Sequence, residues 1–195
     1  MTTQRMEAFT DGVVAILITI MILELKPPAG ATLEALRPIL PVFLVYVLSF
    51  AYLGIYWTNH HHMLQVAEHV NGKVLWANLH LLFWLSLVPV TTAWMGANHD
   101  APIPTATYGL VLLISASSYR ILQNALVALQ GPGSLLATAM GRNRKGLISE
   151  LCYILSIPLA FVSPWISDAL FVAVALIWIV PDQRIESRLA GPARG

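Results

Sequence analysis

The sequence predicts an all-α integral membrane protein that crosses the bilayer six times. Of its 195 residues, 57% are hydrophobic and only 11% are charged, and the mean hydropathy is +0.69. Soluble domains carry about 25% charged residues, and a soluble fold of this size could not hide so much apolar surface from water. The apolar residues also gather into runs of roughly 16 to 25 residues, close to the length that a membrane-spanning helix needs.

Polar, basic or turn-forming residues separate the six predicted spans. The first run ends at KPP (26–28), and the second passes into the polar sequence WTNHHH (57–62). GPG (131–133) forms a turn after the fourth run, and SP (163–164) separates the short fifth and sixth runs. We therefore expect one transmembrane domain over residues 1–195, with spans at 6–25, 38–58, 74–95, 105–129, 147–162 and 165–180.

The distribution of lysine and arginine predicts that both termini are cytoplasmic. Basic residues gather in cytoplasmic loops. With the N-terminus inside, the outer loops hold only Lys26 and Arg37, and Arg120 lies within the fourth span. The other eight basic residues are then cytoplasmic: Arg5, Lys73, Arg142, Arg144, Lys145, Arg184, Arg188 and Arg194. This asymmetry favours an even number of spans. The lone Cys152 excludes an intrachain disulfide, and the net charge of +1 gives no reason to expect a nucleic-acid partner.

The first span presents one continuous apolar line. At 100° per residue, Ile16, Ile20 and Leu23 share a stripe on one side of the helix, and Phe9 extends it toward the N-terminus. Thr19 borders this stripe and places a hydroxyl group beside it. Periodicity alone favours ordinary packing between helices, with Asp11 and Arg5 at the interface.

Asp11 is a charged residue inside this first run. It lies roughly 140° from Ile16, so we expect it to point toward neighbouring helices, whereas Val14 lies roughly 160° from Ile16. Charged groups at membrane depth usually face the protein interior or a water-filled path. Because the run carries Asp11 and has no clear A-x-A site, we expect a retained span and not a cleaved signal peptide.

A second polar cluster connects the end of the second span with the start of the third. Trp57 and His60 lie before the short loop, and Trp76 and Asn78 follow it, so these helix ends should be neighbours. A buried charge needs a partner, and we consider a hydrogen-bonded network that takes up Asp11 or Arg5. An interfacial belt of tryptophan and histidine is the other interpretation.

The three consecutive histidines, 60–62, raise the question of a metal site, since imidazole binds zinc, copper and iron. Adjacent helical residues point about 100° apart, so the three rings cannot face one ion. We therefore expect neither a metal nor a cofactor. Arg120 lies in SASSYRILQN, where we expect the polar face to pack inward with Ser117 and Asn124. The chain has no TVGYG, Walker or G-x-S-x-G motif, which leaves a channel, a transporter or a scaffold and not an enzyme.

The start of the first span reads R-x-x-x-F-T-D, from Arg5 through Phe9 and Thr10 to Asp11. It resembles the R-x-x-x-F-S-D signature of the transmembrane protein 175 family, the lysosomal potassium channel and its bacterial homologues. The segments WTNHHH and LWANLHLLFWLSLVP resemble that family too, and a single six-span repeat is typical of its bacterial members. Thr10 replaces the usual serine and keeps the hydroxyl group. Spans four to six match in hydrophobicity and length.

The resemblance implies a homotetramer in the cell membrane, in which the first helix of each subunit lines a central potassium-selective pore. The family's constriction falls on Ile16, Ile20 and Leu23, and its hydroxyl layer falls on Thr19. Helical geometry selected the same face without the resemblance. Permeating potassium ions are then the ligand, and the lipid bilayer and three further subunits are the partners. A secondary transporter of a cation or small solute is the alternative, although no inverted repeat is visible. A membrane metalloenzyme that uses the histidines is a third.

Overall fold

The computed structural model describes residues 3–131, 133–140 and 144–179, and every regular element within these ranges is a helix. Arg142, Arg184, Arg188 and Arg194, which the charge distribution assigned to the cytoplasmic side, lie outside the described residues. In chain order the elements are α1 (Thr3–Leu23), η1 (Leu33–Leu36), α2 (Leu40–Gln65), α3 (Gly72–Leu85), α4 (Val88–Ala97), α5 (Pro102–Gln130), α6 (Leu135–Met140), α7 (Arg144–Ala160) and α8 (Pro164–Ile179).

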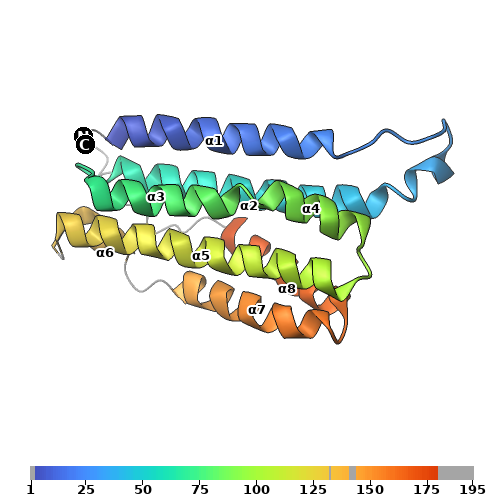
Figure 1. Ribbon diagram of the computed structural model, residues 1–195. Helices are drawn as coiled ribbons and strands as arrows, with labels where there is room; N and C mark the ends of the chain where they lie inside the picture. Colours follow the sequence, from blue (N-terminus) through green and yellow to red (C-terminus); the bar gives the residue numbers. More distant parts are fainter. Residues whose placement is uncertain (1–2, 132, 141–143, 180–195) are drawn as a thin grey trace, which may run out of the picture.

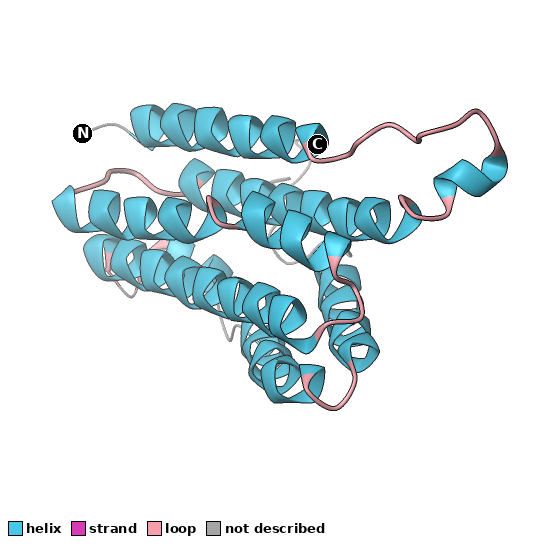
Figure 2. Ribbon diagram, turned by 45° about the vertical axis from the view of Figure 1, so that its right-hand side comes forward, coloured by secondary structure: helices cyan, strands magenta, loops and turns pink. Residues whose placement is uncertain are grey.

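Four stretches are long and apolar enough to cross a bilayer: Thr3–Leu23, Leu40–Gln65, Gly72–Ala97 and Pro102–Gln130. They overlap the first four predicted spans, so the chain is a multi-pass membrane protein with four long spans. The predicted end of the second span at residue 58 is wrong, because α2 continues through the WTNHHH segment to Gln65. α7 and α8 are shorter, at 17 and 16 residues. They form an antiparallel hairpin that packs against α5 (Figures 1 and 2).

The third span is one predicted run that the structure divides into α3 and α4. Pro89 stands in the first turn of α4 and has no N–H group, so it cannot donate to the preceding turn. The backbone N–H of Ser86 instead closes α3 on Leu82 at 2.9 Å, and that of Leu87 donates to Trp84 at 3.2 Å. The two pieces remain nearly collinear and together serve as a single span (Figure 1).

The helices form a bundle with α1 at one edge and the α7–α8 hairpin at the opposite edge (Figure 1). α1 packs against α2, α3 and α4, while α7 packs against α5 and α8. One apolar core lies among α1, α2, α3 and α5, with Leu53, Leu81 and Leu122 almost fully buried. The other lies toward α8, around Tyr108 and Phe171. The connection between α1 and α2, which includes η1, projects beyond the rest of the bundle (Figure 2).

Several buried polar groups between the spans pair with one another, as a protein in lipid requires. Thr92 donates its hydroxyl to Ser49 at 2.6 Å, and Ser49 shares a 2.9 Å hydrogen bond with the Tyr108 hydroxyl. The Tyr52 hydroxyl donates to the backbone carbonyl of Phe171 at 2.6 Å. These contacts fix α2 against α4, α5 and α8, and so define the frame on which α1 is placed.

Candidate pore-lining face and its supporting network

One side of α1 faces the bundle and the other is uncovered. Met6, Thr10, Val14, Leu17 and Met21 are buried. The residues of the predicted stripe are exposed: Phe9 is 54% exposed, Ile16 57%, Ile20 44% and Leu23 77%. Because α1 lies at the edge of the bundle, none of the residues that the structure describes covers this stripe.

Thr19 is exposed beside the stripe, and its hydroxyl group has a defined orientation. The hydroxyl donates to the backbone carbonyl of Ile16 at 2.9 Å. A hydroxyl has one proton and two acceptor lone pairs. Since the proton is directed into the helix, the lone pairs of the oxygen remain on the exposed side of α1.

Asp11 contacts α2 and not the exposed stripe. The indole Nε1 of Trp57 donates to the carboxylate of Asp11 at 2.9 Å. This is the direction that the helical geometry indicated, toward a neighbouring helix. The hydrogen bond is partly accessible, because Trp57 itself is 44% exposed.

A buried chain of hydrogen bonds lies behind Asp11. The side-chain amide of Asn78 donates to the hydroxyl of Thr10 at 3.0 Å, and its carbonyl oxygen lies 2.9 Å from Nε2 of His60. All three side chains are 2% exposed. With the amide oriented this way, its oxygen must accept, so Nε2 of His60 carries the proton. The chain joins α1, α2 and α3 at the end of the bundle where α1 begins.

Sequence reasoning missed a further contact one helical turn away. Nδ1 of His61 donates to the carboxylate of Glu7 at 2.6 Å, and Gln65 donates to Nε2 of the same ring at 2.8 Å. The ring of His61 also stacks on Trp57, with the centroids 6.1 Å apart and the planes 17° apart. Glu7 precedes Asp11 by four residues and His61 follows Trp57 by four. In an antiparallel helix pair this spacing brings Glu7 to His61 once Asp11 is paired with Trp57, but the sequence alone does not give that pairing.

Two residues of the predicted network lie outside it. Trp76 is 74% exposed on α3, although Asn78 two positions later is buried. Arg5 is exposed and forms no ion pair with any residue that the structure describes. Within the same described ranges, no three histidine, cysteine, aspartate or glutamate side chains gather as a metal site would require.

The fold defines a class of protein: a helical multi-pass membrane protein. Its first span packs against α2, α3 and α4 on one side and is exposed on the other. Residues 5–89 match the family model described as "Endosomal/lysosomal potassium channel TMEM175". A relative named a potassium channel, from Chryseobacterium sp. (strain P1-3), is 52% identical over 189 residues, which are 97% of this chain and 98% of the relative. The chain belongs to the TMEM175 family.

Two more distant relatives agree with this assignment. A protein of Streptomyces collinus, also named a potassium channel, is 32% identical over 170 residues and 82% of each chain. The crystal structure of a lysosomal potassium-selective channel TMEM175 homolog from Chamaesiphon minutus superposes with a TM-score of 0.74 at 25% identity, over 91% of this chain and 96% of that one. The similarity therefore extends through the C-terminal helices as well as the signature region.

Proposed function

We propose that this protein is a potassium channel whose pore is lined by α1 from four subunits. The similarity to a named potassium channel over almost the whole chain carries this proposal. It is supported by the exposed face of α1, since a single helix cannot enclose a pore and homo-oligomers usually have closed symmetry. TMEM175 is a family of ion channels, and enzymatic activity is not part of the proposal.

The composition of the uncovered face supports close contact between subunits. Ala8 and Gly12 are both exposed and are four residues apart, so they lie above one another on the same side of α1. Small residues at this spacing allow membrane helices to approach closely. Four such helices could meet near their N-terminal ends and surround a narrow axis.

Ile16, Ile20 and Leu23 would form successive aliphatic rings around that axis. A narrow apolar constriction closes a channel because water does not wet it, so the hydrated ion cannot pass. Opening then requires the α1 helices to tilt or rotate outward. The network of Thr10, Asn78 and His60 would hold the beginning of each helix while its remaining turns move.

Thr19 would supply the oxygen atoms nearest to the permeating ion. Its hydroxyl proton is directed to the Ile16 carbonyl, so four Thr19 oxygens could replace part of the hydration shell of potassium. Discrimination against sodium would rest on the different cost of dehydrating the two ions.

The complete topology in this proposal has six spans and two cytoplasmic termini. α7 and α8 serve as the fifth and sixth spans, each about 25 Å long at 1.5 Å per residue. The basic residues at the start of α7, Arg144 and Lys145, then lie on the same side as Arg5, as the positive-inside rule requires.

Reconstitution into liposomes tests the proposal. With a potassium gradient and no added ionophore, we expect uncoupled potassium flux that follows the gradient and exceeds sodium flux under the same conditions. Chemical crosslinking in native membranes should yield a tetramer. Saturable uptake that requires a second ion would contradict the channel and favour a transporter, and a monomer in both mild detergent and native membranes would exclude the shared pore.

A further inference from the structure

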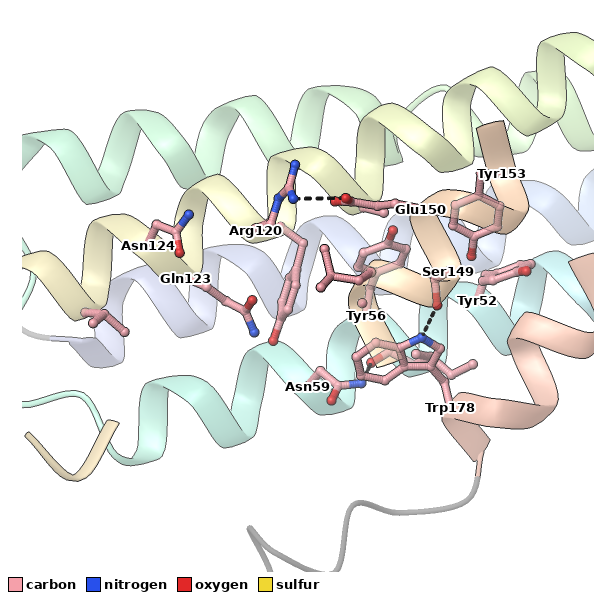
Figure 3. A pocket seen from close by; sticks show the side chains of 16 residues that line it. Tyr52, Tyr56, Asn59, Arg120, Gln123, Asn124, Ser149, Glu150, Tyr153 and Trp178 are labelled. Atoms are coloured by element: carbon pink, nitrogen blue, oxygen red, sulfur yellow. Dashed lines mark hydrogen bonds and ion pairs between the residues drawn. The ribbon is translucent and has the colours of Figure 1, made fainter. Parts of the chain in front are cut away.

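A cavity of about 230 Å³ lies between α2, α5, α7 and α8, and no residue of α1 lines it (Figure 3). It sits at the end of the bundle where α7 begins and α8 ends. Its walls are mainly aromatic and aliphatic, with Tyr56 from α2, Tyr119 from α5 and Trp178 from α8. Tyr56 and Tyr119 meet edge to face with centroids 5.9 Å apart, and Trp178 donates to Ser149 at 2.9 Å.

Arg120 and Glu150 form an ion pair at this cavity, with Nη1 and Oε2 3.0 Å apart (Figure 3). The carboxylate is well covered, with 13% of the Glu150 side chain exposed, but the Arg120 side chain is 48% exposed. The inward packing expected for Arg120 from its sequence surroundings is therefore wrong. A guanidinium carries five N–H donors, and a contact with one carboxylate leaves much of this group facing outward.

Arg120 lies well inside the membrane-spanning part of α5, where an exposed charge is energetically unfavourable unless water or a polar group contacts it. Arg120 lies ten residues before the end of α5, about 15 Å along the helix. The exposed residues beside it, Ile121 and Leu147, are aliphatic and of the kind that faces lipid. A charged side chain among acyl chains draws water or headgroups toward itself.

The short hairpin provides the space for a headgroup. α5 is about 43 Å long, whereas α7 and α8 are about 25 Å, and the hydrocarbon core of a bilayer is about 30 Å thick. A segment shorter than the core is accommodated by local thinning, which moves headgroups inward. Arg144 and Lys145, in the same turn of α7 as Gly146 and Leu147 at the cavity, make this corner basic.

We propose that the α2–α5–α7–α8 cavity binds an anionic phospholipid from the leaflet on the N-terminal side of α1. Its phosphate contacts the outward-facing donors of Arg120, and Glu150 positions the guanidinium. The glycerol region and the first methylene groups of one acyl chain occupy the cavity beside Tyr56 and Trp178. Pockets for drug-sized ligands run from about 300 to 1,000 Å³, so this smaller cavity takes part of a lipid. The statement that this leaflet is the cytoplasmic one rests on the topology under "Proposed function", and the rest of the proposal does not.

Native mass spectrometry of the purified full-length protein tests this site without using ion flux. Phosphatidylglycerol and phosphatidylcholine with identical acyl chains are added to protein in mild detergent. We expect one phosphatidylglycerol per subunit, bound about fivefold more tightly than phosphatidylcholine, since one basic residue at a membrane surface contributes that much. Equal affinity for the two lipids, or no bound lipid, would overturn the proposal. A cavity covered by a second subunit would give the latter result.

Two variants locate the bound lipid. Ala116→Phe fills the cavity from α5 without removing a charge, so it should abolish retention of phosphatidylglycerol. Ala128→Phe, at an exposed position of α5 outside the cavity, should retain it. The double variant Arg120→Gln/Glu150→Gln keeps the net charge and should bind both lipids equally. Unchanged preference in the double variant, or unchanged retention in Ala116→Phe, would place the lipid elsewhere, whether or not the protein conducts potassium.

Discussion

α1 and α7 stand at opposite edges of the bundle, and each exposes an aliphatic stripe with the same spacing. On α1 the stripe is Ile16, Ile20 and Leu23; on α7 it is Leu147, Leu151 and Ile154, of which each residue is 52 to 56% exposed. The spacing of four and then three residues is typical of one helical face. Exposure and periodicity therefore do not distinguish a pore face from a lipid face.

The residues beside the two stripes differ. The exposed side of α1 also contains Thr19, Ala8 and Gly12, which offer a hydroxyl oxygen and small surfaces for close helix contact. The exposed positions between Leu147 and Leu155 on α7 are all leucine or isoleucine. Large aliphatic side chains alone suit lipid, whereas small and hydroxyl residues among them suit a protein interface. The following predictions test this distinction.

The largest effect is expected from breaking the buried network behind α1. Asn78→Leu leaves Thr10 and His60 buried without their partner, and each unpaired group costs about 1–3 kcal/mol. We expect a loss of about 3 kcal/mol in the free energy of unfolding in detergent, measured by denaturant titration. Trp76→Leu, two residues away and exposed, should change it by less than about 0.5 kcal/mol. Similar losses in both variants would mean that the network does not anchor α1.

The next effect separates the two stripes directly. Ile16→Asn should hydrate the narrowest ring and raise resting potassium flux about tenfold, equivalent to lowering the barrier by about 1.4 kcal/mol. Discrimination against sodium should weaken as well. Leu151→Asn is the matched control, because its 56% exposure is close to the 57% of Ile16. Liposome flux measures both. If resting potassium flux rose in Leu151→Asn and not in Ile16→Asn, the assignment of the pore to the α1 edge of the bundle would be wrong.

Helical geometry alone would select Val14 as the control position, since it lies about 160° from Ile16 on α1. At 3% exposure it is part of the core. Asparagine there buries an unpaired amide and destabilises the protein by about 1–3 kcal/mol. Val14→Asn would thus lower the yield of folded protein and say little about the pore.

Periodicity predicted the exposed side of α1 and the direction of Asp11, because both follow from the geometry of a single helix. It could not predict which residue of α2 meets Asp11, since the register of two helices depends on how closely they pack. The Glu7–His61 contact could be predicted only with that register known. The prediction for Arg120 was wrong for a different reason. A polar face turns inward only when no polar group can reach it from outside. The short α7 and α8 let lipid headgroups or water approach Arg120.

A smaller effect is expected from Asp11→Ala. The carboxylate accepts the Trp57 N–H, but the pair is partly accessible, so lipid headgroups or water can replace it. We expect a loss of about 1 kcal/mol in stability and a reduced fraction of tetramer in native mass spectrometry. Asp11→Asn keeps an acceptor oxygen and should restore both. If the Asp11→Ala tetramer is fully assembled and its ion selectivity is altered, Asp11 belongs to the ion path and not to the scaffold.

The smallest effect concerns Thr19 and tests the exposed side of α1 at a single atom. Thr19→Val has nearly the same shape but replaces the hydroxyl with a methyl group, so the ring keeps its width and loses its oxygen atoms. Because the aliphatic rings at Ile16 and Leu23 remain, resting flux should stay low. In the open state the ratio of potassium to sodium permeability should fall about threefold, since the dehydrated ion loses its hydroxyl ligands. Thr19→Ser keeps the oxygen and should retain the ratio, which reversal potentials under bi-ionic conditions report. The opposite result would be a permeability ratio that falls in Thr19→Ser, which lacks the methyl group, and is retained in Thr19→Val, which keeps it. That result would show that pore width and not the hydroxyl oxygen discriminates between the ions.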